Sequence, residues 1–155
     1  MTRILSTRTD LTLDLVCEVA WKGEPIALSP EAMAAMASGR DRLVRILEHD
    51  PDITIYGVTT GAGQMARTKL NPEERKGWAK MTPVGAAASW GHLLPDRVVR
   101  AIVLARLTNF IEGQAAVSPE IAAGVAAMLD DAEQPQVPAM GQGGAGEILS
   151  LSHLF

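Results

Sequence analysis

The residues best suited to chemistry are a tyrosine and the glycine-rich loop that follows it. Tyr56 is the chain's only tyrosine and directly precedes segment 57–63, which holds three glycines. A phenol can donate or accept a proton at a reacting atom, and glycine lets backbone approach a ligand closely. We therefore predict that Tyr56 is a catalytic acid/base; a structural tyrosine beside a turn is the alternative. The loop residues predicted to contact substrate or an oxyanion are Thr59, Thr60, Gly61 and Gly63.

A second glycine-rich loop lies near the end of the sequence. Segment 141–147 reads Gly-Gln-Gly-Gly-Ala-Gly-Glu. Consecutive backbone N–H groups in such a loop can form a nest that binds an anion. A flexible loop without a ligand is the alternative. The residues predicted to stabilise a developing oxyanion are Gly143, Gly144, Ala145 and Gly146.

Composition predicts one helical domain that spans residues 1–155. The chain has 47% hydrophobic but only 4% aromatic residues, which favours packed helices, so we expect a mostly α fold with little β structure. A net charge of −4 without a basic tract argues against nucleic-acid and anionic-membrane partners. No apolar run approaches the roughly 20 residues of a membrane span. We expect a cytoplasmic protein.

Metal chemistry and thiol chemistry are not predicted. The three histidines are widely spaced, and the sequence contains no CxxC, HExxH or P-loop motif. Cys17 is the single cysteine, so no internal disulfide can form. We expect Cys17 to be a small buried apolar residue.

Several helices must position the two loops. A capping residue, a proline and an acid occur together at 29–31, 71–73 and 118–120, and this combination marks a helix start. The first of these helices is predicted over 30–49, and a further helix over 95–112.

Three other segments carry weaker signals. Ser38 and Gly39 are expected to loosen the middle of the helix at 30–49. The β-branched segment 53–55 is expected to be extended and to lead into the tyrosine loop. The apolar segment 148–155 is expected to pack inside or to be covered by another chain.

The tyrosine loop resembles a signature of the aromatic amino acid ammonia-lyase and aminomutase family, Tyr-Gly-Val-Asn-Thr-Gly-Phe-Gly, with Thr59 in place of the asparagine and Ala62 in place of the phenylalanine. Segment 100–113 is similar to the family's Leu-Leu-Arg-Leu-Asn helix, and 137–147 to its Val-Pro and Ala-Ser-Gly stretch. The resemblance covers nearly the whole chain. It implies the N-terminal part of a fumarase/aspartase-like helical fold, with Tyr56 as a catalytic acid/base.

The resemblance breaks where the family builds its cofactor. There, Ala-Ser-Gly cyclises and the serine loses its hydroxyl to give methylideneimidazolone, whereas this chain reads Gly144-Ala145-Gly146-Glu147 and has no serine. The family's Ser-His pair falls on Gly85-Ala86. We therefore predict an enzyme without this cofactor.

The resemblance implies a role as one part of a larger enzyme. We predict a small subunit that joins a larger C-terminal ammonia-lyase-like chain in a hetero-oligomer. Tyr56 would serve elimination, isomerisation or ring-closing conjugate addition on a small molecule. Two alternatives stay open: a non-catalytic scaffolding subunit, and a conventional ammonia-lyase with an unusual cofactor.

Overall fold

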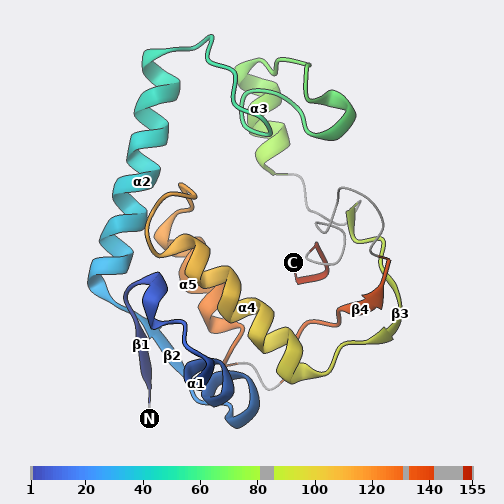
Figure 1. Ribbon diagram of the computed structural model, residues 1–155. Helices are drawn as coiled ribbons and strands as arrows, with labels where there is room; N and C mark the ends of the chain where they lie inside the picture. Colours follow the sequence, from blue (N-terminus) through green and yellow to red (C-terminus); the bar gives the residue numbers. More distant parts are fainter. Residues whose placement is uncertain (1, 81–85, 131–132, 142–151, 155) are drawn as a thin grey trace.

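The computed structural model describes residues 2–80, 86–130, 133–141 and 152–154, and these are mostly helical (Figure 1). The prediction of a mostly α fold with little β structure is confirmed. The helices are α1 (Leu13–Val16), the π-helical turn η2 (Cys17–Trp21), α2 (Pro30–His49), α3 (Pro72–Ala79), α4 (Asp96–Phe110) and α5 (Pro119–Ala127). The strands are β1 (Arg3–Leu5), β2 (Ile26–Leu28), β3 (Trp90–Leu93) and β4 (Pro138–Met140). Short 3₁₀ turns are η1 (Arg8–Asp10), η3 (Gly63–Met65) and η5 (Ser152–Leu154).

The helix starts follow the local capping signals. Ser29 accepts the backbone N–H of Ala32 through its hydroxyl at 3.1 Å, and proline fills the first position of α2. Asn71 and Ser118 cap α3 and α5 in the same way. α2 runs over the whole predicted range, and α4 ends two residues before the predicted end at residue 112.

The small sheets are two-stranded. β1 pairs with β2 in parallel, and β3 pairs with β4 antiparallel with an irregular register. Segment 53–55 leads into the tyrosine loop but belongs to no strand. The expectation that Cys17 is buried was wrong, because η2 turns it toward solvent. In the apolar end of the chain, the described residues Ser152 and Leu154 are buried, so this part packs inside.

The hydrophobic core is organised around α4. Four α4 side chains are completely or almost completely buried, namely Val99, Val103, Leu104 and Leu107. They pack with Val19 of η2, Met36 of α2 and Val125 of α5 in one cluster. We call the part of the molecule that holds this cluster the body. Among the described residues from 37 to 98, none belongs to this cluster of buried side chains, so the tyrosine loop lies outside the core.

A close contact between two glycines fixes α2 on the body. A Cβ on Gly39 would lie 1.9 Å from the carbonyl oxygen of Gly113, and a Cβ on Gly113 would lie 2.1 Å from that of Ala35. The Gly113 backbone also has φ +71°, which favours glycine. Gly39 therefore does not loosen α2, which is one unbroken helix. Because Gly39 has no side chain, the helix can contact the backbone of Gly113 in the segment after α4.

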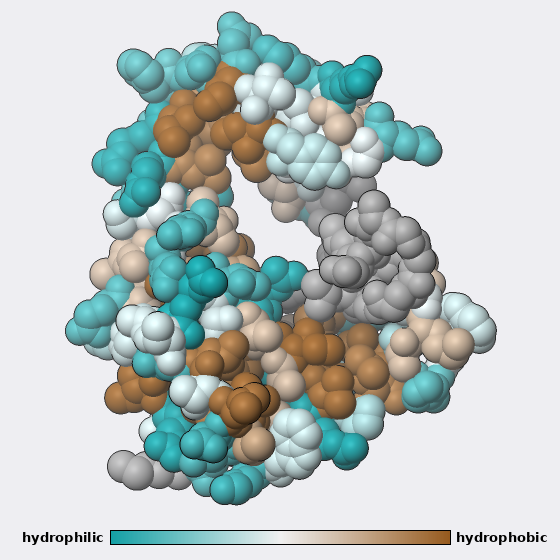
Figure 2. Space-filling model, viewed as in Figure 1, coloured by the Kyte–Doolittle hydropathy of each residue, from teal (hydrophilic) through white to brown (hydrophobic). Residues whose placement is uncertain are grey.

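The far end of α2 carries a separate unit, residues 51–80, which we call the tyrosine lobe. It comprises the tyrosine loop, η3 and α3, and Figure 1 shows it joined to the end of α2 that is distant from β1 and β2. The space-filling view shows open space between this lobe and the part of the body formed by α4 and α5 (Figure 2). None of the helices among the described residues is long and apolar enough to cross a membrane.

Candidate active site

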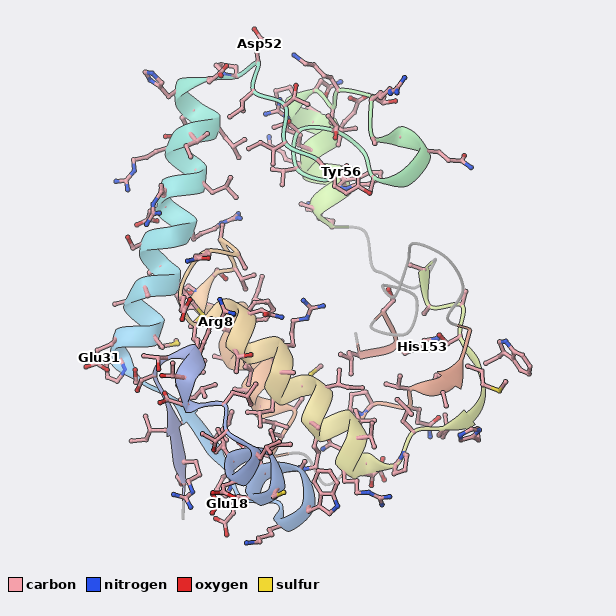
Figure 3. All side chains as sticks on the ribbon, in the orientation of Figure 1. Arg8, Glu18, Glu31, Asp52, Tyr56 and His153 are labelled. Carbon is pink, nitrogen blue, oxygen red and sulfur yellow. The ribbon has the colours of Figure 1, made fainter. Side chains whose placement is uncertain are left out.

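Tyr56 lies on a tight turn that is closed by backbone hydrogen bonds. The N–H groups of Val58 and Thr59 donate to the Ile55 carbonyl at 3.1 and 2.9 Å. Gly57, inside this turn, adopts φ +72°. The Tyr56 side chain is 64% exposed. Figure 3 shows it on the edge of the tyrosine lobe that faces the rest of the molecule. The turn thus presents the phenol to the open space between lobe and body.

The oxygen of the Tyr56 hydroxyl accepts a hydrogen bond from the loop that follows it. The backbone N–H of Gly63 donates to it at 2.9 Å, and Gly63 has φ +59°. Within the described part of the chain, no acceptor takes the hydroxyl proton of Tyr56. A backbone N–H can donate to a hydroxyl and to a phenolate alike. The phenol is therefore fixed in place while its proton remains available.

Thr59 holds the turn from inside. Its side chain is 1% exposed, and its hydroxyl accepts the N–H of Ile55 at 2.7 Å and donates to the Ile53 carbonyl at 2.8 Å. Its own carbonyl accepts the N–H of Leu70 at 2.9 Å. The Thr59 hydroxyl thus replaces the backbone pairing that segment 53–55 would have in a strand.

The next two residues also pack within the lobe. Thr60 donates its hydroxyl to the Gly61 carbonyl at 3.0 Å, and Gly61 donates its N–H to Thr68 at 3.1 Å. A Cβ on Gly61 would lie 2.5 Å from the Cβ of Met65, so glycine is required there. In this structure the hydroxyls of Thr59 and Thr60 form hydrogen bonds with backbone groups of the loop itself. A contact of these residues with substrate stays a prediction.

Two basic side chains of the lobe donate hydrogen bonds to backbone carbonyl groups near its start. Arg75 of α3 donates from Nε to the Leu70 carbonyl at 3.0 Å and from Nη2 to the Pro51 carbonyl at 3.4 Å. Lys69 donates from Nζ to the carbonyl of Asp52 at 3.1 Å. These bonds join the beginning of the lobe to its second half. Neither role could be predicted from the sequence, because contacts with distant carbonyl groups leave no local signal.

The second glycine-rich loop falls on residues that the structure does not describe. Gly143, Gly144, Ala145 and Gly146 all lie outside the described ranges, so their oxyanion role stays a prediction. Ser89 touches the described residues on both sides of this loop. A Cβ on Gly141 would lie 2.8 Å from the Ser89 Cα, and the Ser89 N–H donates to Nε2 of His153 at 3.2 Å.

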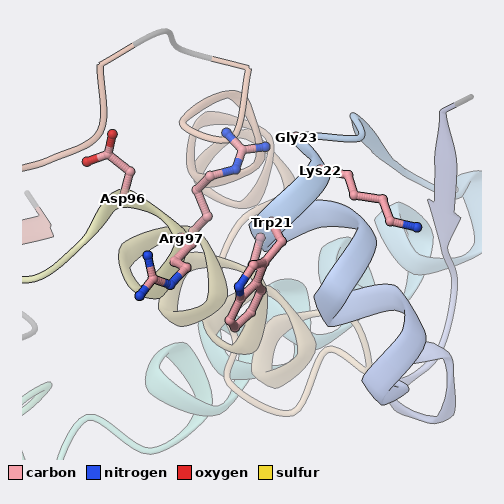
Figure 4. A pocket seen from close by; sticks show the side chains of 7 residues that line it. Trp21, Lys22, Gly23, Asp96 and Arg97 are labelled. Carbon is pink, nitrogen blue, oxygen red and sulfur yellow. The ribbon is translucent and has the colours of Figure 1, made fainter.

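The pocket in Figure 4 lies at the start of α4, in the body. It has a volume of about 480 Å³ and is lined by Ala20, Trp21, Lys22, Gly23, Asp96, Arg97 and Arg100. Arg100 donates from Nε to the Val19 carbonyl at 2.9 Å and from Nη1 to the Leu129 carbonyl at 2.6 Å. Its guanidinium thereby ties α4 to η2 and to the residues that follow α5. No residue of the tyrosine loop lines this pocket.

Within the described ranges, no three or more His, Cys, Asp or Glu side chains gather as a metal would require.

Comparison with solved structures defines the class of protein. The tyrosine aminomutase of Streptomyces globisporus matches 99% of this chain with a TM-score of 0.86 and 29% sequence identity, and the match covers 28% of that chain. The fold is thus that of the N-terminal part of ammonia-lyase and aminomutase structures.

Sequence comparison gives the family. The aromatic amino acid lyase model matches residues 11–155, and the chain belongs to this family. The histidine ammonia-lyase of Streptomyces coelicolor is 36% identical over 144 residues, which are 92% of this chain and 28% of that protein. The MIO-dependent tyrosine 2,3-aminomutase of S. globisporus is 31% identical over 145 residues, 93% of this chain and 26% of that protein. The chain thus spans less than a third of the length of these relatives.

Proposed function

We propose that this chain is the small, N-terminal subunit of a two-chain ammonia-lyase-like enzyme in which Tyr56 is the catalytic acid/base. One observation carries the proposal. The Tyr56 hydroxyl is exposed toward the open space, anchored through its oxygen by the Gly63 N–H, and free to transfer its proton. A phenol positioned in this way suits proton donation as a general acid, and its phenolate, which the same Gly63 N–H can hold, suits proton removal next to an activated carbon.

The residues of the second loop do not fit the family's prosthetic group. Methylideneimidazolone requires a β-hydroxyl to eliminate from its central serine, and segment 141–147 contains neither serine nor threonine. Chemistry that needs no internal electrophile is therefore proposed. In the proposed step the Tyr56 phenolate takes a proton from a small-molecule substrate and becomes the phenol. Elimination, isomerisation or intramolecular conjugate addition follows, and the phenol can return the proton. The N–H groups of Gly143, Gly144, Ala145 and Gly146 are the proposed donors to the developing oxyanion.

The proposal includes a larger partner chain. The relatives that align with nearly all of this chain contain more than three times its length. In the proposed enzyme, a second ammonia-lyase-like chain supplies the remaining helical part, and the active site lies where the two chains meet. The substrate enters between the tyrosine lobe and that partner.

A substitution of Tyr56 by phenylalanine tests the proposal. Tyr56→Phe keeps the ring but removes the hydroxyl, so turnover by the two-chain complex should fall by orders of magnitude, about 10²–10⁴-fold. Circular dichroism and co-purification with the partner should stay as in the wild type. Near-normal turnover in this variant would remove Tyr56 from the mechanism.

A non-catalytic scaffolding subunit is the second candidate. The missing serine favours it, as does the use of both threonine hydroxyls within the loop. The exposure of Tyr56 supports the enzyme instead, because it leaves the phenol accessible to a ligand. Titration with small acidic or aromatic compounds, followed by calorimetry in the wild type and in Tyr56→Phe, discriminates between the two. Saturable binding that Tyr56→Phe weakens supports the enzyme.

A further inference from the structure

The inner face of α2 continues beyond the body. In the first half of the helix, Ala32, Met36 and Gly39 form one stripe, and all three are buried. Their spacing of four and three residues keeps them on one side of an α-helix. This half of the stripe is covered by the core and by the contact with Gly113.

The same spacing leads to apolar residues in the second half of α2, none of which is buried as Ala32, Met36 and Gly39 are. Leu43, Ile46 and Leu47 extend the stripe by four, seven and eight residues from Gly39. Ile46 is 40% exposed and the adjacent Val44 is 37% exposed, while Leu43 and Leu47 are half-buried. We call Leu43, Ile46 and Leu47 the distal stripe.

The opposite side of this half-helix is charged. Asp41 and Arg45 are exposed, and each lies two residues from Leu43, about half a turn around the helix. An amphipathic helix presents its apolar side to a packing partner and its charged side to water. In Figure 2, apolar side chains gather on the upper part of α2 and the lobe beside the open space. The distal stripe is therefore a packing face, continuous with one that is already occupied.

We infer that the distal stripe is the docking surface for the larger partner chain, and that an apolar helix of that chain lies along it. The inference rests on the proposed two-chain enzyme. The relatives share this fold over 99% of the chain and carry most of their length in addition, so the family has further structure to place against this face. A helix laid along the stripe fills the space toward which Tyr56 faces. Docking would thus complete the active site as well as cover the stripe.

A matched pair of double variants tests the inference. Leu43→Gln/Leu47→Gln changes the stripe, whereas Asp41→Gln/Arg45→Gln changes the charged side. Both introduce glutamine at i and i+4 of the same helix, and both leave the net charge unchanged. The probe is the ammonia-lyase-like chain of the same organism that corresponds to the remaining length of the relatives, produced together with this chain. Complex formation is measured by size-exclusion chromatography with light scattering and by titration of the purified chains.

The stripe variant should bind the large chain at least about tenfold more weakly, and the charged-side variant should bind like the wild type. Amide exchange in residues 40–49 of the wild type should slow when the large chain is added, a readout that does not depend on the variants. Equal binding by both variants, with unchanged exchange in 40–49, would overturn the docking surface while leaving the two-chain enzyme intact. If the wild type binds no such chain and the stripe is protected by a second copy of itself, both proposals fail.

Discussion

The backbone N–H of Gly63 donates to the Tyr56 hydroxyl over 2.9 Å, so the residue that ends the glycine loop holds the phenol that begins it. This bond spans seven residues and needs φ +59° at Gly63, a conformation that glycine adopts at little cost. The catalytic candidate and the loop beside it are therefore one structural unit. Gly63 in this motif thus orients a side chain.

Loss of the Thr59 hydroxyl should loosen this unit. Thr59→Val preserves the shape but leaves the Ile55 N–H and the Ile53 carbonyl without their partner, which should cost about 1–3 kcal/mol. Amide exchange at Ile55 should accelerate accordingly. Thr59→Ser keeps the hydroxyl and should retain most of the protection. Equal exchange in the valine and serine variants would show that the hydroxyl does not hold the turn.

The contact between α2 and the segment after α4 should tolerate no side chain. Gly39→Ala places a methyl group 1.9 Å from the Gly113 carbonyl oxygen, so the backbone must shift, at a cost of about 1–3 kcal/mol or more. Gly124→Ala in α5 meets no atom within 4 Å and should be neutral or stabilise by up to about 1 kcal/mol. Thermal unfolding of the two variants measures the difference. Similar midpoints would contradict the close approach.

Arg100 should stabilise the body through its two carbonyl contacts. Arg100→Met keeps the aliphatic stem but removes the bonds to Val19 and Leu129, and should cost about 1.5–3 kcal/mol. Arg97→Met, one turn away and exposed, should change stability by less than about 0.5 kcal/mol. Urea unfolding of both variants provides the comparison. An equal effect at the two positions would rule out the proposed role of Arg100.

Asp10 should contribute a pH-dependent part of the stability near the first residues. The backbone N–H groups of Thr7 and Ser6 donate to its carboxylate and lower its pKa below the ordinary value of 3.8. Because the folded pKa is the lower one, this stabilisation is present above the unfolded value and is lost as pH falls through the folded value. Asp10→Asn should therefore be less stable than the wild type near neutrality. The difference should shrink below about pH 4. A constant difference in urea midpoints down to the acid limit would contradict this.

The elements could be predicted where the signal is local. The helix starts at Pro30, Pro72 and Pro119 each follow a capping residue, and the structure confirms all three. Tyr56 could also be identified as a candidate from its glycine-rich surroundings. Its outward orientation could not, because it depends on the Gly63 N–H and on the buried Thr59 hydroxyl.

Long-range contacts explain what the sequence analysis missed. Gly39 and Gly113 are far apart in the chain, so Gly39 was read as a weak point of α2 when it is a contact. Cys17 was expected inside, but the π-turn at η2 rotates it outward. The roles of Arg75 and Arg100 depend on carbonyl groups that only the folded chain brings near them.

The most direct test of the account is the turnover number of the two-chain complex with Tyr56→Phe, compared with wild type at saturating substrate. If Tyr56 transfers the proton, kcat should fall by about 100-fold or more while the complex stays assembled. A kcat within about threefold of the wild type, less than 1 kcal/mol in the barrier, would show that the phenol is structural and would contradict the central claim.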